Sequence, residues 1–409
     1  MKILLIHQYF LEKDDPGGSR FNEMSKTWEE KGHSVTVLAG MVHYNTGKKR
    51  PKHKGKFICK EVYSKKVNVV RCHVSESYNT NFIGRLWAYF SFVFSSLWAG
   101  IFYARKKYDV ILVTSPPLFV GISGYLLSRI KRIPLVFEVR DLWPESAIDT
   151  GVLTNGLIIK MAYWFEGFIY KKSKIINTLT PAFQKILIEK KNVAANKVIM
   201  IPNASDFSLA NEVQKGFNKD EFRKEHEFGD NLVITYVGAH GIANHLIQLV
   251  EAAEILKEEK VLILSIGAGM QQEMLREEVK KRNLTNIRFL DPVPKAEVFK
   301  FILASDIGTS VLKKVDTFKT IYSNKTFDYM SCKKPILMMI DGVSRDLLEN
   351  SKSGFFVEPE NPSDFAEKTR IYLKQPELLQ QQGESGYQYA LKHFDRSVLA
   401  EKYLEYLKF

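Results

Sequence analysis

The sequence predicts an α/β protein made of two doubly wound, Rossmann-like domains, and three observations support this fold class. Short apolar runs bounded by turn residues alternate with helical patterns along nearly the whole chain, which is typical of parallel sheets covered by helices on both faces. The 409 residues provide room for two domains of ordinary size. A hydrophobic share of 45% and a charged share of 26% exclude a fibrous or wholly disordered chain.

The predicted strands fall into two similar series. In the first half of the chain they are Lys2–His7, Ser34–Ala39, Val67–Cys72, Val110–Thr114, Leu135–Val139, Lys174–Thr178 and Val198–Ile201. In the second half they are Leu232–Val237, Val261–Ile266, Ile287–Phe289, Ile307–Val311, Ile336–Met339 and Phe355–Val357. A helix is predicted at Phe21–Lys31, because its apolar spacing stops at Gly32, a residue type that commonly follows a helix C-terminus.

The domain boundary is predicted near Asn203–Asn211, a segment rich in turn formers after a strand. We therefore assign residues 1–204 to the N-terminal domain and 205–385 to the C-terminal domain. The last segment, Gly383–Phe409, has apolar residues at helical spacing and no strand after it. Residues 386–409 are therefore expected to form a helix that packs back on the N-terminal domain.

Charge and cysteine content narrow the partners and the compartment. The chain has 59 basic and 46 acidic residues, a net charge of +13, which indicates an anionic partner: nucleic acid, a membrane surface or a phosphorylated substrate. No nucleic-acid-binding motif accompanies the charge. The three cysteines have an odd count and no CxxC spacing, which favours a reducing cytoplasm. The apolar N-terminus is interpreted as a first strand and not as a signal peptide.

Two segments suggest a membrane surface. Leu86–Ala104 has no charged residue and is rich in aromatic residues, and it is flanked by Arg85 and by Arg105–Lys107. It fits a helix that packs on its own domain and dips an aromatic face into a membrane, an ordinary buried helix, or a true membrane span. From Lys48 to Lys66 the chain is strongly basic, which fits either an anionic surface or a solvated loop.

Glycines follow several predicted strands at points where a loop turns toward a helix. They are Gly17 and Gly18 after the first strand, Gly238 and Gly241 after Val237, and Gly267 and Gly269 after Ile266. Glycine at such a turn lets backbone N–H groups approach a phosphate or a sugar, although a glycine pair also makes ordinary turns. No segment has the full dinucleotide fingerprint or a Walker A sequence, so NAD and ATP cradles are not predicted.

The strongest local signal is the segment SNKTFDYMSCKKPIL, which begins at Ser323. Ser323, Asn324 and Lys325 bring hydroxyl, amide and ammonium donors to a predicted helix N-terminus, where the helix dipole also favours a diphosphate. Asp328 lies on the same helix face and can accept hydrogen bonds from ribose hydroxyls. The alternative is an N-cap followed by an ordinary amphipathic helix.

Together with four other segments, this one gives the chain a family resemblance. The others are PGGSRFNEMSKTWEEKGHSVTVLAG, FEVRDLWPES, YVGAHGIANHL and GYQYALKHFDRSVLAEKYL. The chain resembles glycosyltransferase family 4, the retaining GT-B enzymes, and within it the bacterial O-antigen and capsule enzymes. The resemblance implies two Rossmann-like domains that face a cleft. The C-terminal domain would bind a nucleotide sugar, the N-terminal domain would bind the acceptor, and the last helix would cross back.

Three positions depart from the family pattern. The family's glutamate pair falls at Thr320 and Asp328, so its first carboxylate is missing. The common arginine and lysine after the first strand of the second domain fall near Ala239 and Asn244. The usual histidine before Asp-Leu-Trp-Pro is Arg140. The diphosphate is therefore expected to rely on Lys325, on helix N-termini near Gly241 and on Arg140.

These considerations give three sets of candidate site residues. The catalytic candidates are Lys325, Asp141 and Arg140. The donor-binding candidates are Gly17, Gly18, Gly238, His240, Gly241, Asn244, Gly267, Gly269, Ser323, Asn324 and Asp328. The acceptor-binding candidates are Trp143, Glu145 and His7. For Asp141 a helix cap is the alternative, for Trp143 a place in the core, and for each histidine a structural role.

The resemblance implies a retaining transfer of sugar from a nucleotide diphosphate donor. The expected donors are UDP-linked N-acetylated amino sugars such as N-acetyl-L-fucosamine. The implied acceptor is a polyprenyl-diphosphate-linked saccharide at the inner face of the cytoplasmic membrane. The sequence has no DxD triplet, and neither a metal nor a cofactor is expected. The alternative is a GT-B sugar-nucleotide epimerase or a hydrolase without a lipid acceptor. A nucleic-acid partner is not expected.

Overall fold

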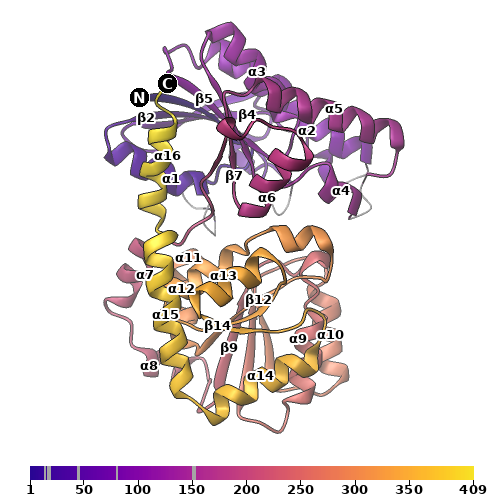
Figure 1. Ribbon diagram of the computed structural model, residues 1–409, viewed down its shortest axis with the longest axis vertical. Helices are drawn as coiled ribbons and strands as arrows, with labels where there is room; N and C mark the ends of the chain where they lie inside the picture. Colours follow the sequence, from indigo (N-terminus) through magenta and orange to yellow (C-terminus); the bar gives the residue numbers. More distant parts are fainter. Residues whose placement is uncertain (13–14, 16–19, 44–46, 80–81, 150–152) are drawn as a thin grey trace. The chain divides into compact units, whose positions relative to one another are not determined.

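The computed structural model describes all residues except 13–14, 16–19, 44–46, 80–81 and 150–152, and the chain divides into two compact units (Figure 1). Unit 1 comprises Met1–Pro202 and Leu399–Phe409, and unit 2 comprises Asn203–Val398. Each unit contains its own sheet, and helices cover both faces of it. This architecture confirms the predicted fold class of two Rossmann-like α/β domains.

The described residues of unit 1 form an eight-stranded sheet in the order β3-β4-β2-β1-β5-β6-β7-β8. Its strands are β1 (Lys2–Ile6), β2 (Ser34–Gly40), β3 (Ile58–Val62), β4 (Val67–Cys72), β5 (Val110–Ser115), β6 (Leu135–Val139), β7 (Ile175–Thr178) and β8 (Val198–Met200). Neighbouring strands run parallel, except that β3 pairs antiparallel with β4. The central strands are buried along nearly their whole length, as strands covered on both faces must be.

The helices of unit 1 lie in two layers. They are α1 (Arg20–Glu30), α2 (Phe82–Phe102), α3 (Val120–Lys131), α4 (Glu145–Asp149), α5 (Gly156–Lys172) and α6 (Pro181–Lys185). Right-handed crossovers that lead toward β8 put α2, α3 and α5 on one face of the sheet. The crossover from β1 to β2 leads in the opposite direction and puts α1 on the other face. The terminal helix α16 (Arg396–Tyr406) packs beside α1, where Trp28 Nε1 donates a hydrogen bond to the Ala400 carbonyl at 2.8 Å.

Unit 2 contains a parallel sheet in the order β11-β10-β9-β12-β13-β14. Its strands are β9 (Leu232–Val237), β10 (Val261–Ile266), β11 (Ile287–Leu290), β12 (Ile307–Val311), β13 (Ile336–Met339) and β14 (Gly354–Phe356). Its helices are α7 (Phe207–Gln214), α8 (Lys219–Glu225), α9 (Ile247–Ile255), α10 (Gln272–Lys281), α11 (Lys295–Ala304), α12 (Asn324–Ser331), α13 (Val343–Ser351), α14 (Pro362–Lys374) and α15 (Glu377–His393).

Three local predictions were wrong in detail. The basic segment Lys48–Lys66 contains the edge strand β3, which the sequence did not predict because Lys60 and Glu61 interrupt its apolar character. Gly383–Phe409 is not one helix, since α15 ends at His393 and α16 begins at Arg396. The helix expected directly after Gly241 is a single turn of 3-10 helix, and α9 begins only at Ile247.

The aromatic segment Leu86–Ala104 forms most of α2. One side of this helix is buried against the rest of unit 1 through Ala88, Phe92 and Ala99, whereas Trp87 and Trp98 are at least half exposed. In the part of the chain that the structure describes, no helix has both the length and the apolarity that a membrane crossing requires. The segment therefore packs on its own domain and keeps an aromatic face open.

Each sheet has a point where the strand order reverses. In unit 1 this strand is β1, which lies between β2 and β5, and in unit 2 it is β9, which lies between β10 and β12. Open α/β sheets bind ligands beyond the carboxyl ends of the strands at such points. His7 follows β1 and Gly238 follows β9, so the topology directs attention to these two loops.

Candidate active site

In unit 2, the loops after β9 and β10 pack backbone against backbone. Gly267 has φ +154°, and a Cβ atom there would lie 1.8 Å from the Gly238 carbonyl oxygen. A Cβ atom on Gly269 would lie 2.3 Å from the His240 carbonyl oxygen. Only glycine permits this approach, which two hydrogen bonds complete: His240 N–H donates to Ala268 at 2.9 Å, and Gln271 N–H donates to His240 at 3.0 Å.

Lys325 lies beside these loops, in the first turn of α12. Its Nζ donates a hydrogen bond to Ser323 Oγ at 3.2 Å and lies 4.8 Å from the centre of the Tyr236 ring. A Cβ atom on Gly238 would lie 3.0 Å from Lys325 Cε, so the lysine stem runs along the glycine loop. Burial lowers the pKa of Lys325 to about 8, and the charge of Asp328 acts in the opposite direction.

The ammonium of Lys325 has no ion-pair partner among the described residues. Its contacts are one hydroxyl and one aromatic face, and neither neutralises it. A partly buried cation of this kind is costly unless an anion accompanies it. The geometry thus leaves a position for an anionic group next to Lys325, at the point where the strand order of unit 2 reverses.

The N-terminus of α12 adds further donors. Ser323 occupies the N-cap position, but its side chain makes no capping hydrogen bond and its hydroxyl accepts from Lys325 instead. Asn324 is exposed and begins the helix, whose first backbone N–H groups form the positive pole of the helix dipole. Asp328 is partly buried one turn further on. The alternative of an ordinary N-cap therefore does not describe how Ser323 is used.

His240 lies beneath the two glycine loops and is wholly buried. Its Nε2 is 3.0 Å from Ser265 Oγ, and its ring packs edge-on against Phe289. Burial lowers the pKa of His240 to about 4, and nearby Arg276 acts in the same direction, so the imidazole is neutral at pH 7. The His240 side chain thus links the loop after β9 to β10 through its contact with Ser265.

Gly241 and Asn244 bound the short turn that follows. Asn244 N–H donates to the Gly241 carbonyl at 3.0 Å, and Lys313 N–H donates to the Ala243 carbonyl at 2.8 Å, which ties this turn to the loop after β12. A hollow of about 290 Å³ that opens to solvent lies at the same edge of the sheet. It is lined by Lys313, Lys314, Val315, Phe318, Lys319, Ile340, Asp341, Glu358 and Pro359. The carboxyl edge of unit 2 thus combines donors with open volume.

In unit 1, the loop after β6 carries Arg140, Asp141, Trp143 and Glu145. Ser146 Oγ donates to Asp141 Oδ2 at 2.7 Å, so a side chain of α4 holds this carboxylate. Burial raises the pKa of Asp141, although the hydrogen bond from Ser146 lowers it. Trp143 is partly buried and contacts the Phe119 ring edge-on at 5.4 Å, so it belongs in large part to the core.

Glu145 is engaged by a lysine. Lys191 Nζ lies 2.7 Å from Glu145 and 2.6 Å from the buried carboxylate of Glu166, so one ammonium bridges two carboxylates. Burial raises the pKa of Glu166 to about 7, against the opposing effect of Lys191. Glu145 therefore has a structural partner in addition to any contact with an acceptor.

His7 is also buried, between the rings of Phe10 and Phe21. Burial holds its pKa well below the usual value, and the charges of Arg140 and Arg71 act in the same direction. Arg140 is thus close enough to influence His7, and both lie at the carboxyl edge of the unit 1 sheet. Gly17 and Gly18 fall outside the described residues.

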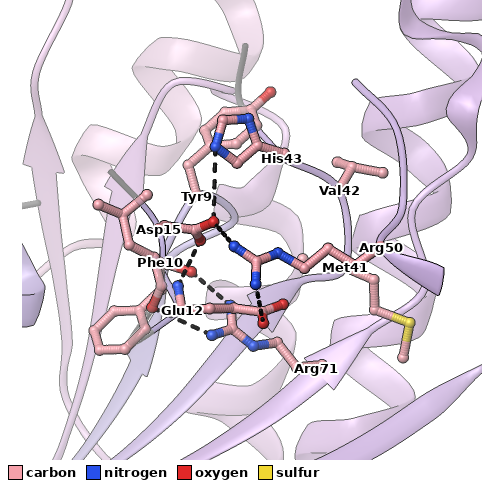
Figure 2. Close-up of a pocket in the computed structure, with 11 residues that line it drawn as sticks. Tyr9, Phe10, Glu12, Asp15, Met41, Val42, His43, Arg50 and Arg71 are labelled. Carbon is pink, nitrogen blue, oxygen red and sulfur yellow. Dashed lines mark hydrogen bonds and ion pairs between the residues drawn. The ribbon is translucent and has the colours of Figure 1, made fainter. Parts of the chain in front are cut away.

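A polar pocket at this edge was not predicted from the sequence. It has a volume of about 310 Å³ and lies beyond the ends of β1 and β2 (Figure 2). Arg50 is paired with Asp15 and, at 3.3 Å, with Glu12, and His43 Nε2 lies 3.8 Å from Asp15. The only sequence signal for this pocket was the acidic run beside Gly17 and Gly18, whose partners lie far away in the chain.

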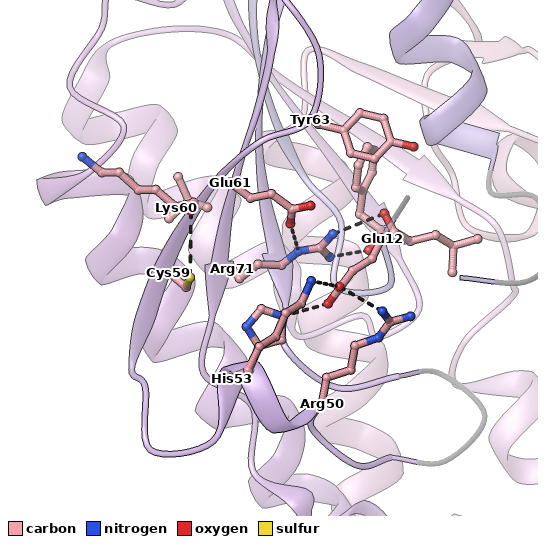
Figure 3. A network of polar contacts seen from close by, with 12 residues as sticks. Glu12, Arg50, His53, Cys59, Lys60, Glu61, Tyr63 and Arg71 are labelled. Carbon is pink, nitrogen blue, oxygen red and sulfur yellow. Dashed lines mark hydrogen bonds and ion pairs between the residues drawn. The ribbon is translucent and has the colours of Figure 1, made fainter. Parts of the chain in front are cut away.

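Glu12 is the centre of a wider network (Figure 3). It accepts from Lys52 and, at 2.7 Å, from His53 Nε2, and these hydrogen bonds lower its pKa although burial acts in the opposite direction. Arg71 Nε donates to Glu61 at 3.1 Å and the guanidinium also reaches backbone carbonyls. Much of the positive charge of Lys48–Lys66 that faces this pocket is therefore neutralised internally.

A second buried network lies in unit 1, around Arg20 and Glu138. Arg20 donates to both carboxylate oxygens of Glu138, at 3.0 and 3.2 Å, and also to the carbonyls of Ile201 and Pro202. Asn177 Nδ2 donates to Glu138 at 2.8 Å. The Arg20–Glu138 ion pair joins the start of α1 and the strand β6 to Ile201 and Pro202, the last residues before unit 2. The guanidinium and the carboxylate neutralise each other.

Comparison with known proteins identifies the family. The model of the glycosyl transferase 4-like domain matches residues 17–204, and that of the glycosyl transferases group 1 matches residues 218–389. The chain belongs to the glycosyltransferase family that these two domain models describe. The glycosyltransferase is 25% identical to the putative colanic acid biosynthesis glycosyl transferase WcaI of Escherichia coli (strain K12) over 293 residues, which cover 71% of each chain.

Two further relatives agree with this family. The probable glycosyltransferase WbjE of Pseudomonas aeruginosa is 22% identical over 262 residues, which cover 63% of this chain and 64% of that protein. The crystal structure of HepE from Anabaena in complex with UDP and glucose has a TM-score of 0.72 and 16% identity, and the match covers 100% of this chain and 99% of that one. The glycosyltransferase therefore has the GT-B fold that the resemblance implied.

Proposed function

We propose that this enzyme transfers a sugar from a nucleotide diphosphate donor to a lipid-linked saccharide, with retention of the anomeric configuration. The observation that carries the proposal is Lys325, a partly buried cation without an ion-pair partner among the described residues, at a helix N-terminus and beside two glycine loops. A leaving diphosphate is the group that this arrangement would stabilise.

The chemistry requires little beyond charge stabilisation. The bond between the anomeric carbon and the donor phosphate oxygen breaks, and the acceptor hydroxyl oxygen forms a bond to that carbon on the same face. The acceptor proton goes to the departing phosphate oxygen, so no protein base is required. Lys325 would balance the charge that develops on the diphosphate, with Ser323 and the α12 backbone orienting it. His240 would act as a positioning residue for the glycine loops.

The donor and the product class are proposed from the relatives. HepE was solved with UDP and glucose, and the name of WcaI refers to colanic acid biosynthesis. We propose a UDP-linked sugar, specifically an N-acetylated amino sugar such as N-acetyl-L-fucosamine, and a role in O-antigen or capsule polysaccharide synthesis. Asp328 would accept hydrogen bonds from the ribose hydroxyls. The donor site would be lined by Gly238, Gly241, Asn244, Gly267, Gly269 and Asn324.

The acceptor is assigned to the carboxyl edge of unit 1. Trp143, Glu145 and His7 remain candidates there, with Arg140 and Asp141 beside them. The pocket at Asp15, His43 and Arg50 adds carboxylate, imidazole and guanidinium groups that suit saccharide hydroxyls. A polyprenyl-diphosphate-linked acceptor would place the reaction at the inner face of the cytoplasmic membrane, and the three free cysteines are consistent with a reducing compartment.

The test is a product assay with two lysine variants. Purified protein is incubated with UDP-linked sugars and an acceptor saccharide, and transferred and free sugar are measured separately. We expect Lys325→Ala to lose about 100- to 1,000-fold in transfer rate with its fold retained. Lys402→Ala, on the exposed face of α16, serves as the matched control and should leave the rate unchanged.

Two outcomes would contradict the proposal. Near-wild-type transfer by Lys325→Ala would remove the assigned role of the lysine. Release of free sugar or formation of an epimer, without transfer to any acceptor, would favour the hydrolase or epimerase alternative.

A further inference from the structure

Three helices of unit 1 form a continuous layer on one face of its sheet. Helix α3 packs against both α2 and α5. Ser96 Oγ of α2 donates to Ser123 Oγ of α3 at 2.9 Å, and the Leu127 side chain of α3 lies where Gly100 has no side chain. Small residues at these contacts let the helices approach closely, which leaves their larger side chains to face inward or outward.

The outward side of α2 is apolar along its whole length. Five exposed residues repeat at helical spacing and so lie on one face, with exposed fractions from 42% to 77%. They are Ile83, Trp87, Phe94, Trp98 and Phe102. A soluble helix normally places charged residues on this side, and the only charged residue of α2 is Arg85.

The neighbouring helices continue this surface. Leu126 and Ile130 of α3 are exposed one turn apart, and Leu157, Met161 and Trp164 of α5 are exposed by 69%, 61% and 69%. Tyr125 of α3 contacts Phe168 of α5 at 5.0 Å, and Phe168 in turn stacks on Trp164, which links the two apolar stripes. We call the exposed apolar residues of α2, α3 and α5 the three-helix surface.

The exposed charged side chains of these three helices have one sign. The basic residues of these helices are Arg85, Arg129, Lys131, Lys160, Lys171 and Lys172. Their single acidic residue is Glu166, which is 2% exposed and paired with Lys191. Exposed Arg105, Lys106 and Lys107 follow α2 directly. The surface therefore presents apolar and aromatic side chains together with basic ones, and no exposed carboxylate from these helices.

We propose that the three-helix surface docks the enzyme on an anionic lipid bilayer. Tryptophan and aliphatic side chains enter the interface between headgroups and acyl chains, while lysine and arginine bind anionic headgroups. A second copy of the chain fits poorly, because a symmetric contact would bring basic residues against basic residues with no carboxylate to pair them. The inference rests on the proposed lipid-linked acceptor, to which it adds the surface that holds the enzyme at the membrane.

Part of the positive charge of the basic segment Lys48–Lys66 is engaged within unit 1. Arg50, Lys52 and His53 are engaged by the carboxylates of Glu12 and Asp15. A membrane could therefore bind the charges of Arg50 and Lys52 only in competition with these carboxylates. On the three helices, Lys131 Nζ donates to the Ala104 carbonyl at 2.8 Å and Lys172 Nζ lies over the Phe168 ring, and just after α2 Arg105 Nε donates to the Phe102 carbonyl at 2.8 Å.

The experiment measures binding of the full chain to vesicles without donor or acceptor. Vesicles of phosphatidylglycerol and phosphatidylcholine are compared with vesicles of phosphatidylcholine alone, by co-sedimentation. Wild type should bind the anionic vesicles, more weakly at high salt. The variant Trp87→Ser/Trp98→Ser/Trp164→Ser should lower the partition coefficient about tenfold or more. The control Ile255→Ser/Leu373→Ser/Leu391→Ser removes exposed apolar residues of unit 2 and should bind like wild type.

The outcomes separate docking from catalysis. Wild-type protein that ignores anionic vesicles, or a triple tryptophan variant that binds them like wild type, would overturn the proposal. A concentration-dependent dimer that disappears in the tryptophan variant, without vesicle binding, would assign the surface to a second copy instead. Transfer to a water-soluble acceptor saccharide is measured in parallel and should be unchanged in the tryptophan variant. If wild type transfers sugar but does not bind anionic vesicles, only the docking proposal is contradicted. If wild type binds the vesicles but transfers no sugar, only the proposed reaction is contradicted.

Discussion

Two partly or wholly buried cations of unit 1, Arg20 and Arg50, and one of unit 2, Lys325, are held in opposite ways. In unit 1, the buried Arg20 is matched by Glu138, and Arg50 is matched by Asp15 and Glu12. In unit 2, Lys325 has only a hydroxyl and an aromatic ring within contact in the described part of the chain. Charges that are paired hold loops and strands in place, whereas an unmatched charge at a strand end is available to a ligand.

The comparison also separates the substrates expected at the two edges. A site whose charges balance internally suits a polar but locally neutral group such as a saccharide, because binding need not supply a counter-charge. A site with one unmatched cation suits an anion. This division is what a transfer from a nucleotide diphosphate to a sugar acceptor would require.

The largest expected effect concerns the buried pair of unit 1. Arg20→Met leaves Glu138 buried without its partner and should lower the stability of unit 1 by about 3–5 kcal/mol. Hydrogen exchange of the β6 and β7 amides measures this locally, because a two-unit chain need not unfold in one step. Arg282→Met is the matched control, since it removes surface ion pairs with Glu254 and Glu278 and should cost less than about 1 kcal/mol. Equal effects would contradict the contrast between paired burial and surface pairing.

A second prediction is the pH dependence of donor affinity. Since the pKa of Lys325 is lowered to about 8 by burial, the ammonium is charged below that pH and neutral above it. UDP affinity should therefore fall by about tenfold per pH unit as the pH rises from 8. Lys325→Arg keeps its charge and should give a flat profile over the same range, measured by calorimetry. Parallel profiles for both proteins would show that another group titrates.

The smallest expected effect has the opposite sign to the first. Lys325→Met removes a charge whose burial is unfavourable at pH 7, because that pH lies below the lowered pKa. The stability of unit 2 should therefore rise by about 1 kcal/mol, read from hydrogen exchange of the β9 and β12 amides. A marked loss of stability would mean that Lys325 is a structural residue and would end the contrast with Arg20.

Local patterns predicted most of the fold but not the long-range pairs. The strands β9, β10, β12 and β13 match their predicted bounds, because buried parallel strands appear as short apolar runs. Strand β3 was missed because an edge strand need bury only part of one face, so Lys60 and Glu61 carry no strand signal. The break between α15 and α16 was missed because the helical spacing continues through Phe394 and Asp395.

The candidate site was predictable only where it is local. Ser323, Asn324 and Lys325 are adjacent, so one helix N-terminus brought them together in the sequence as in the structure. Arg50 and Asp15 are 35 residues apart, and Arg20 and Glu138 are 118 apart, so no spacing indicated either pair. Likewise, the buried position of His240 depends on the loop after β10, which packs over it, and not on its neighbours in the chain.

The central claim is that Lys325 is the unmatched cation that receives the donor diphosphate. Calorimetric binding of UDP at pH 7 to wild type, Lys325→Met and Lys402→Ala tests it without an acceptor, a membrane or turnover. We predict that Lys325→Met binds about 10- to 100-fold more weakly than wild type and that Lys402→Ala binds equally well. Equal UDP affinity in all three proteins would contradict the claim.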